Sequence, residues 1–292
     1  MPSLPKKGCR DPDRPKKLQT ATGRRWMMTN KARKYRDKAV IEPARVIQER
    51  RSIGLHPSCS VPAAAFLCYD TEFWQWVCAR PGHVECDGWL KGSYLVSCGD
   101  SWVLILKVPG FGAPTAVMTL EELGAFGISR FVTLGTAGGL QQNMNVGDIV
   151  ICDRAIRDEG TSHHYLPVEK YAYSCPEMTE NLCTAFEKKG IQHSKGTSWT
   201  TDAPYRETIE ELRQHRSDGV ATIEMEASAL FAVGAYRGVS VSSSFVISDI
   251  LSEEDWNQGY HSAEKLEGLK KIFEVAMETI AIICKNDQIK TS

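Results

Sequence analysis

The sequence has no apolar run that approaches the roughly 20 residues with which a helix crosses a bilayer. Near its start it also lacks the apolar segment that a secretory signal peptide carries. The ten cysteines are scattered, with no C-x-x-C pair and no zinc-finger spacing to the histidines. We therefore expect a cytoplasmic protein that has reduced thiols, no transmembrane helix and no bound metal.

Charge is distributed unevenly along the chain, although the net charge is only −1. Residues 1–51 hold 16 Lys and Arg against 5 Asp and Glu, whereas the remaining residues hold 19 against 31. We predict a basic N-terminal arm over residues 1–50 and a folded domain over residues 51–288. Several roles are open for this arm. It is either a solvated tail, a segment that contacts its own domain or a neighbouring subunit, a segment that binds a polyanion, or a mitochondrial presequence.

Apolar runs of strand length alternate with helical patterns after the arm. Strands are expected at 63–68, 94–98, 103–108, 131–134, 148–152, 219–224 and 239–248, and helices at 114–126, 176–189, 227–236 and about 264–284. Several strands are apolar throughout, as in sheets covered on both faces. This order predicts one α/β domain with a mostly parallel or mixed central sheet.

Two glycine-rich segments follow apolar strands. In the first, Gly110 and Gly112 free the backbone just before a helix start, where an anion would be attracted unless the turn is purely structural. In the second, the three glycines of residues 135–139 let the backbone bend or lie close to a ligand. Thr136 adds a hydroxyl at the carboxyl end of its strand, where open α/β sheets bind ligands.

Carboxyl groups follow two further strands. Glu224 and Glu226 flank Met225, and a carboxylate accepts the two hydrogen bonds that the vicinal hydroxyls of a ribose donate. Asp249 follows a strongly apolar strand. In a partly dry cleft it would hold its proton and could pass it to a leaving group, or it caps the next turn.

A third group of residues has the composition of a base pocket or of core packing. Trp199, Tyr205 and Arg206 combine two aromatic rings with a guanidinium, which suits stacking on a planar ring. His163 and His164 lie in a polar loop without carboxylates at metal-binding spacing. That loop is expected to border a site or a subunit contact.

Six segments in order resemble one family over roughly residues 60–284. They are Gly110-Phe-Gly-Ala-Pro-Thr, Gly135-Thr-Ala-Gly-Gly-Leu, Gly160-Thr-Ser-His-His-Tyr, Thr201-Asp-Ala-Pro-Tyr, Glu224-Met-Glu-Ala and Val246-Ile-Ser-Asp. The family is that of uridine phosphorylase, hexameric-type purine nucleoside phosphorylase and the methylthioadenosine/adenosylhomocysteine nucleosidases. The resemblance implies a single three-layer domain and an enzyme that cleaves the N-glycosidic bond of a nucleoside.

The resemblance also implies roles for individual residues. Ribose would contact Met225, Glu226 and Glu224, phosphate would contact Gly112 and Thr136, the base would contact Ala137, Gly138, Trp199, Tyr205 and Arg206, and Asp249 would be the catalytic acid. Uridine phosphorylases usually lack such an acid, so purine nucleosides are favoured over uridine. Phosphate would be the co-substrate, with no other cofactor.

The sequence departs from the family at the phosphate site. The Gly-Asp-Pro-x-Arg loop of the phosphorylases is replaced by residues 67–73, which contain no arginine, and Thr133 stands where a second arginine is expected. These losses remove the bidentate phosphate contacts. Lys91, Arg157 or a residue from a neighbouring subunit's arm could replace them. Alternatively, Glu72 lies near the position of the nucleosidases' water-activating glutamate.

Three functions therefore stay open. They are a nucleoside phosphorylase with a rebuilt phosphate site, a nucleoside hydrolase of the same fold, and a catalytically weak nucleoside-binding protein whose arm recruits a partner. The family further implies a homo-oligomer, either a dimer or a trimer of dimers. We expect small-molecule ligands, namely a nucleoside and phosphate, and neither a membrane nor a nucleic acid as partner.

Overall fold

The computed structural model describes residues 34–253 and 256–291. In chain order its elements are α2 (Pro43–Ser52), β1 (Ala64–Cys68), α3 (Thr71–Cys78), β2 (His83–Glu85), η2 (Gly88–Leu90), β3 (Tyr94–Cys98), β4 (Ser101–Lys107), α4 (Ala113–Phe126), β5 (Arg130–Gly139), β6 (Ile149–Asp158), η3 (Ser162–His164), β7 (Tyr171–Tyr173), α5 (Pro176–Lys188), β8 (Ser194–Thr201), η4 (Pro204–Arg206), α6 (Ile209–Ser217), β9 (Thr222–Glu224), α7 (Ala227–Arg237), β10 (Ser240–Leu251), β11 (Trp256–Gln258) and α8 (Ala263–Thr291).

These strands form one mixed sheet. β1 lies between β4 and β5 and runs parallel to both, while β10 runs parallel to β5 and antiparallel to β6. Because β5 also pairs with β9, and β9 is joined through β8 to β6, part of the sheet closes into a barrel-like ring. The carboxyl ends of β1, β5 and β10 consequently meet at one edge of the sheet, where α/β sheets bind ligands.

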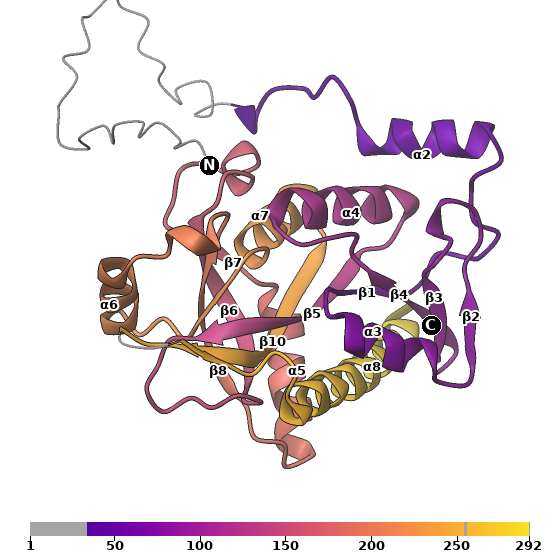
Figure 1. Cartoon of the computed structure of the whole chain (residues 1–292). Helices are drawn as coiled ribbons and strands as arrows, with labels where there is room; N and C mark the ends of the chain where they lie inside the picture. Colours follow the sequence, from indigo (N-terminus) through magenta and orange to yellow (C-terminus); the bar gives the residue numbers. More distant parts are fainter. Residues whose placement is uncertain (1–33, 254–255, 292) are drawn as a thin grey trace, which may run out of the picture.

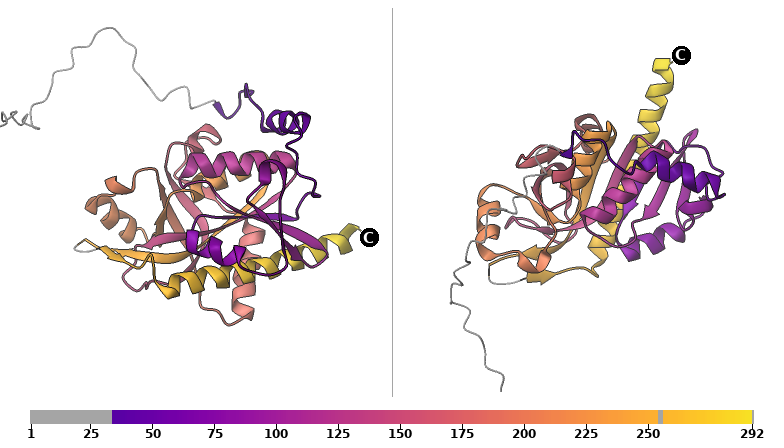
Figure 2. Two further views of the ribbon diagram at one scale, coloured as in Figure 1. Left: turned by 45° about the vertical axis from the view of Figure 1, so that its right-hand side comes forward. Right: turned by 90° about the horizontal axis from the view of Figure 1, so that it is seen from above.

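Helices cover both faces of the sheet and create the expected three layers (Figures 1 and 2). On one face α4 and α7 pack against the sheet in a core that includes Leu120 and Phe231. On the other face α3, α5 and α8 enclose a second core, which includes Phe73, Phe186 and Phe273. The predicted α/β class with a mixed central sheet is confirmed.

The sequence analysis allowed a bend in the glycine-rich run of residues 135–139, but β5 continues through it. Residues 130–139 are one strand, which pairs with the neighbouring parallel strand β10 as far as Gly139. A Cβ atom added to Gly138 would lie 2.4 Å from a Leu251 methyl carbon, and one added to Gly139 would lie 2.9 Å from the Ile250 Cδ1. Glycine is needed there for the close approach of two strands rather than for a turn.

The predicted boundary at residue 50 falls inside α2. This helix packs on α4, where Ile47 is buried and the Arg50 guanidinium bonds to the Glu122 carboxylate at 2.5 Å. The end of the predicted arm is therefore attached to the domain in the part that the structure describes. Residues 1–33, which carry most of the arm's charge, lie outside the described residues, so the role of the arm stays a prediction.

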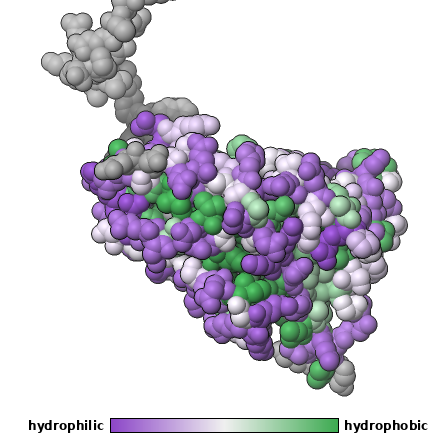
Figure 3. Space-filling model, turned by 60° about the horizontal axis from the view of Figure 1, so that its bottom comes forward, coloured by the Kyte–Doolittle hydropathy of each residue, from purple (hydrophilic) through white to green (hydrophobic). Residues whose placement is uncertain are grey.

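The surface is mostly hydrophilic, with separate apolar patches on the face drawn in Figure 3. Across residues 34–253 and 256–291, no helix has the length and apolar character needed to span a bilayer. The same residues contain no cluster of three or more His, Cys, Asp or Glu placed to hold a metal ion.

Candidate active site

A cavity of about 1460 Å³ opens where the carboxyl ends of β1, β5 and β10 meet. The predicted residues Thr136, Ala137, Gly138, Trp199, Tyr205, Glu224, Met225, Glu226 and Asp249 all line it. Segments more than 100 residues apart in sequence are thus brought to one place. Gly112 and Arg206 are absent from the wall, although Phe111, which precedes Gly112, belongs to it.

Glu226 is held in place by the first glycine-rich turn. The Gly112 N–H donates a hydrogen bond of 2.5 Å to Glu226 Oε1. Gly112 has a φ of 98°, a backbone conformation that favours glycine, and it directly precedes α4. Because its amide is bonded to Glu226, Gly112 positions the predicted ribose carboxylate, and the phosphate contact expected for Gly112 stays a prediction.

The electrostatic surroundings of Glu226 favour its protonated form. Burial, followed by the nearby Glu224 carboxylate, raises the pKa of Glu226 to about 8. Bound hydroxyl groups would donate to the ionised form and favour it. Glu226 is therefore a carboxyl group whose charge depends on what occupies the cavity.

Glu224 has a different environment from Glu226. Its Oε1 accepts from the Thr200 and Ser198 hydroxyls at 2.6 and 3.1 Å, and its Oε2 accepts from the backbone N–H groups of Glu226 and Ala227 at 2.8 and 2.7 Å. Both oxygens are thus bonded to the protein. Glu224 therefore holds the start of α7, and the ribose contact that the resemblance implies for it stays a prediction.

Glu224→Gln is consequently expected to lower the free energy of unfolding by about 2–4 kcal/mol. The amide NH₂ of glutamine would replace one carboxylate oxygen and would then face groups that donate hydrogen bonds to that oxygen. Urea denaturation followed by circular dichroism would measure this change. Glu267→Gln, an exposed carboxylate on α8, is the matched control. A variant as stable as the wild type would contradict the structural role.

Asp249 also lines the cavity and is 5 % exposed. Its carboxylate accepts hydrogen bonds from the Ser248 hydroxyl at 2.7 Å and the Trp256 indole N–H at 2.8 Å. A Cβ added to Gly138 would lie 3.3 Å from Asp249 Oδ2. The predicted acid therefore lies directly against the predicted base-binding segment of β5.

Glu207 is a cavity residue that the sequence analysis missed. Burial, and next the charge of Asp249, raises the pKa of Glu207 to about 7. The carboxyl groups of Glu207 and Asp249, which have different environments, thus both face the part of the cavity in which the base is expected. The only sequence signal was its place directly after Arg206 in the predicted base-pocket segment.

The predicted base-pocket residues divide into three positions. Trp199 is buried, donates from its indole N–H to Asp158 at 2.9 Å and packs on His215, so it forms part of the wall. Tyr205 is 97 % exposed at the rim, where its ring is free to cover a ligand. Arg206 is exposed and does not line the cavity, so the base contact that the resemblance implies for it stays a prediction.

The cations proposed as substitutes for the missing arginines do not line the cavity. The Arg157 guanidinium is buried within its own loop, where it donates to the Ser162 hydroxyl and the Pro167 carbonyl. Lys91 also lies outside the wall. Among the described residues that form the wall, the single Lys or Arg is Lys265 from α8, which the sequence analysis missed.

Tyr69 lines the cavity and belongs to residues 67–73, the stretch compared with the phosphorylase loop. A Cβ added to Gly135 would lie 3.6 Å from the Tyr69 ring. Within residues 34–253 and 256–291, the buried Tyr69 hydroxyl has no hydrogen-bond partner. Burial, followed by the charges of Glu226 and Glu224, holds the pKa of Tyr69 well above its usual range. A buried hydroxyl without a partner in a cavity is suited to bonding a ligand or a water molecule.

Comparison with known proteins supports the resemblance drawn from the six segments. A sequence profile of the phosphorylase superfamily matches residues 92–285. The uridine phosphorylase of Haemophilus influenzae is 30 % identical over 188 residues, which are 60 % of this chain and 67 % of that protein. The guanosine phosphorylase of Halorubrum lacusprofundi is 35 % identical over 140 residues, which are 48 % of this chain and 58 % of that protein.

Solved structures agree in fold. A purine nucleoside phosphorylase from Toxoplasma gondii has a TM-score of 0.67 and 19 % identity, with 77 % of this chain and 93 % of that chain covered. A uridine phosphorylase from Vibrio fischeri has a TM-score of 0.65 and 22 % identity at the same coverage. The resemblance is thereby confirmed, and the chain belongs to the phosphorylase superfamily.

Proposed function

We propose that this protein is a nucleoside phosphorylase, a pentosyltransferase that converts a nucleoside and phosphate into free base and ribose 1-phosphate. The observation that carries the proposal is the Glu226 carboxylate, which lies in the cavity with one oxygen held by the Gly112 amide. The carboxylate has acceptor capacity beyond this bond, which is suited to ribose hydroxyls. Similarity to uridine, guanosine and purine nucleoside phosphorylases supports this activity.

In the proposed reaction the bond between C1′ and the base nitrogen breaks, and its electron pair goes to the base. The sugar develops positive charge, which the carboxylate of Glu226 stabilises from the ribose side. Asp249 provides the proton that neutralises the departing base, and a phosphate oxygen then bonds to C1′. Each group acts from a different strand end, so the fold holds the reactants in line.

Purine nucleosides are the proposed substrates, in preference to uridine. Asp249 and Glu207 both face the base segment, and an acid at this place matches the N7 atom of a purine leaving group. Phosphate as the only co-substrate, and assembly into a homo-oligomer, are further parts of the proposal that follow from the family resemblance.

A nucleoside hydrolase is the second candidate, favoured by the charges of the cavity. Asp70, Glu72 and Tyr69 line the cavity and belong to the stretch compared with the phosphorylase loop, and the Lys265 ammonium is paired with both carboxylates. A dianion would approach a site that already holds excess negative charge, whereas water would not be repelled.

Release of free base from inosine, guanosine, adenosine and uridine, measured by chromatography with and without phosphate, tests the proposal. Phosphate-dependent release that is faster for the purine nucleosides is expected. Equal release without phosphate would establish the hydrolase instead, and nucleoside binding without release would leave a binding protein.

A further inference from the structure

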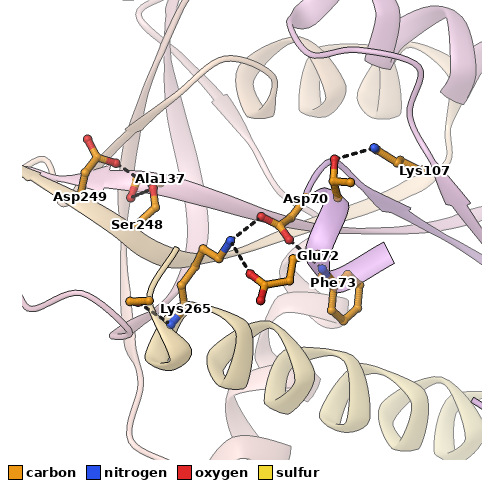
Figure 4. A network of polar contacts seen from close by, with 10 residues as sticks. Asp70, Glu72, Phe73, Lys107, Ala137, Ser248, Asp249 and Lys265 are labelled. Carbon is orange, nitrogen blue, oxygen red and sulfur yellow. Dashed lines mark hydrogen bonds and ion pairs between the residues drawn. The ribbon is translucent and has the colours of Figure 1, made fainter. Parts of the chain in front are cut away.

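Lys265 is a buried cation on the wall of the cavity. It lies in the first turn of α8, and its side chain is 4 % exposed. Its ammonium lies 2.7 Å from Asp70 Oδ2 and 3.5 Å from Glu72 Oε2, as Figure 4 shows. Burying an ammonium without a partner costs free energy. The groups that pair with Lys265 therefore show how much of its charge is left to attract an anionic ligand.

The two carboxylates that pair with Lys265 are not equivalent. Asp70 is mostly buried, and its second oxygen accepts the Phe73 N–H at 2.7 Å, which caps α3. Glu72 is 49 % exposed, lies farther from the ammonium and makes no further hydrogen bond in the described part of the chain. Asp70 alone balances the charge of Lys265, so the Glu72 carboxylate is an extra anion in a weak, solvent-exposed pair.

The fold places Lys265 next to the strand end that carries Thr136. Gly268, one turn along α8, meets β10 so closely that an added Cβ would lie 2.8 Å from a Val246 methyl carbon. Val246 is the register partner of Thr136 in β5. From the other side, β1 pairs with β5 up to Leu134, so that residues 69–70 leave the sheet beside residues 135–136. Lys265 and Asp70 therefore meet beside the predicted phosphate hydroxyl.

We propose that Lys265 is the phosphate ligand of this protein, that Asp70 orients its ammonium, and that Glu72 occupies the anion position until phosphate displaces it. This inference rests on the proposed phosphorylase function. The proposal explains how phosphate can bind without the two arginines. The Lys265 ammonium replaces the two guanidinium groups, and the phosphate dianion takes the place of the half-exposed Glu72 carboxylate.

The Glu72 carboxylate distinguishes this proposal from the hydrolase. If Glu72 competes with phosphate, then Glu72→Gln removes the competitor and is expected to lower the KM for phosphate by about 3–10-fold. If Glu72 instead activates water, the same substitution abolishes base release. Glu72 is half-exposed, so this variant is expected to fold.

Lys265→Met is expected to raise the KM for phosphate by about 10–100-fold and to leave the KM for the nucleoside within about twofold. Isothermal titration with inorganic phosphate provides a readout independent of turnover. Lys270→Met, an α8 cation paired with Glu267 outside the cavity, is the matched control. Should Lys265→Met fail to fold because Asp70 loses its partner, the Glu72→Gln result decides.

The outcomes separate the inference from the function on which it rests. Phosphate-dependent release with both KM shifts supports the inference. If release depends on phosphate but neither variant changes the KM or the phosphate affinity, the inference is overturned and the phosphorylase stands. Phosphate-independent release that Glu72→Gln abolishes overturns both.

Discussion

Glu226→Gln is expected to lower kcat/KM for nucleoside cleavage by about 10²–10³-fold, because two ribose hydroxyls would lose a charged acceptor. The remaining amide oxygen would keep the Gly112 N–H, which now bonds to Glu226 Oε1. The amide NH₂ would then face hydroxyl groups that are themselves donors. Steady-state kinetics with inosine and phosphate measures the loss, and Glu267→Gln is the control for a surface carboxylate.

The pH dependence of stability separates this functional loss from a structural one. The pKa of Glu226 is raised to about 8 from an ordinary value of 4.5, by burial and by Glu224. A raised pKa means that the stabilising contribution is complete below about pH 4.5 and is lost as the pH rises through 8. Glutamine does not ionise and escapes this loss.

Glu226→Gln should therefore be more stable than the wild type at pH 9, and the difference should disappear near pH 4.5. Urea denaturation across this range tests the sign. A variant that is less active and also less stable at pH 9 would indicate that Glu226 serves the fold, as Glu224 does, and would contradict the ribose-binding role.

The sequence predicted which strand ends line the cavity, because apolar runs, glycines and carboxylates are local signals. It did not separate Glu224 from Glu226, since two carboxylates that flank one residue look alike in a sequence. In the structure Glu224 is the last residue of β9, whereas Glu226 directly precedes α7. The structure shows four hydrogen bonds to Glu224 from β8 and the first turn of α7. The hydroxyl partners from β8 reach Glu224 because β8 and β9 pair in parallel, and no local sequence pattern specifies this pairing.

The glycines of β5 illustrate the same limit. A run of three glycines in five residues is typical of a turn or a close approach, and only the neighbouring strand decides between them. Leu251 and Ile250 of β10 fill the space above Gly138 and Gly139, so the strand continues. Lys265 was missed for a related reason, because its partner Asp70 lies 195 residues away and only tertiary packing brings them together.

Asp249→Asn is expected to lower kcat for purine nucleosides by about 10²–10⁴-fold, the usual contribution of a positioned general acid. The Ser248 hydroxyl and the Trp256 indole N–H would keep at least one acceptor, so the side chain should stay in place. Asp218→Asn, an exposed aspartate paired with Lys170 outside the cavity, is the matched control.

A purine nucleoside methylated at N7 makes this test specific for proton transfer. Its base already carries the positive charge that protonation would supply, so it departs without help from an acid. Asp249→Asn should cleave this substrate at nearly the wild-type rate while its activity on the unmethylated nucleoside is lost. An equal loss on both substrates would mean that Asp249 positions the base through Gly138 and does not donate the proton, and a protonated Glu207 would then be the remaining acid on that side of the cavity.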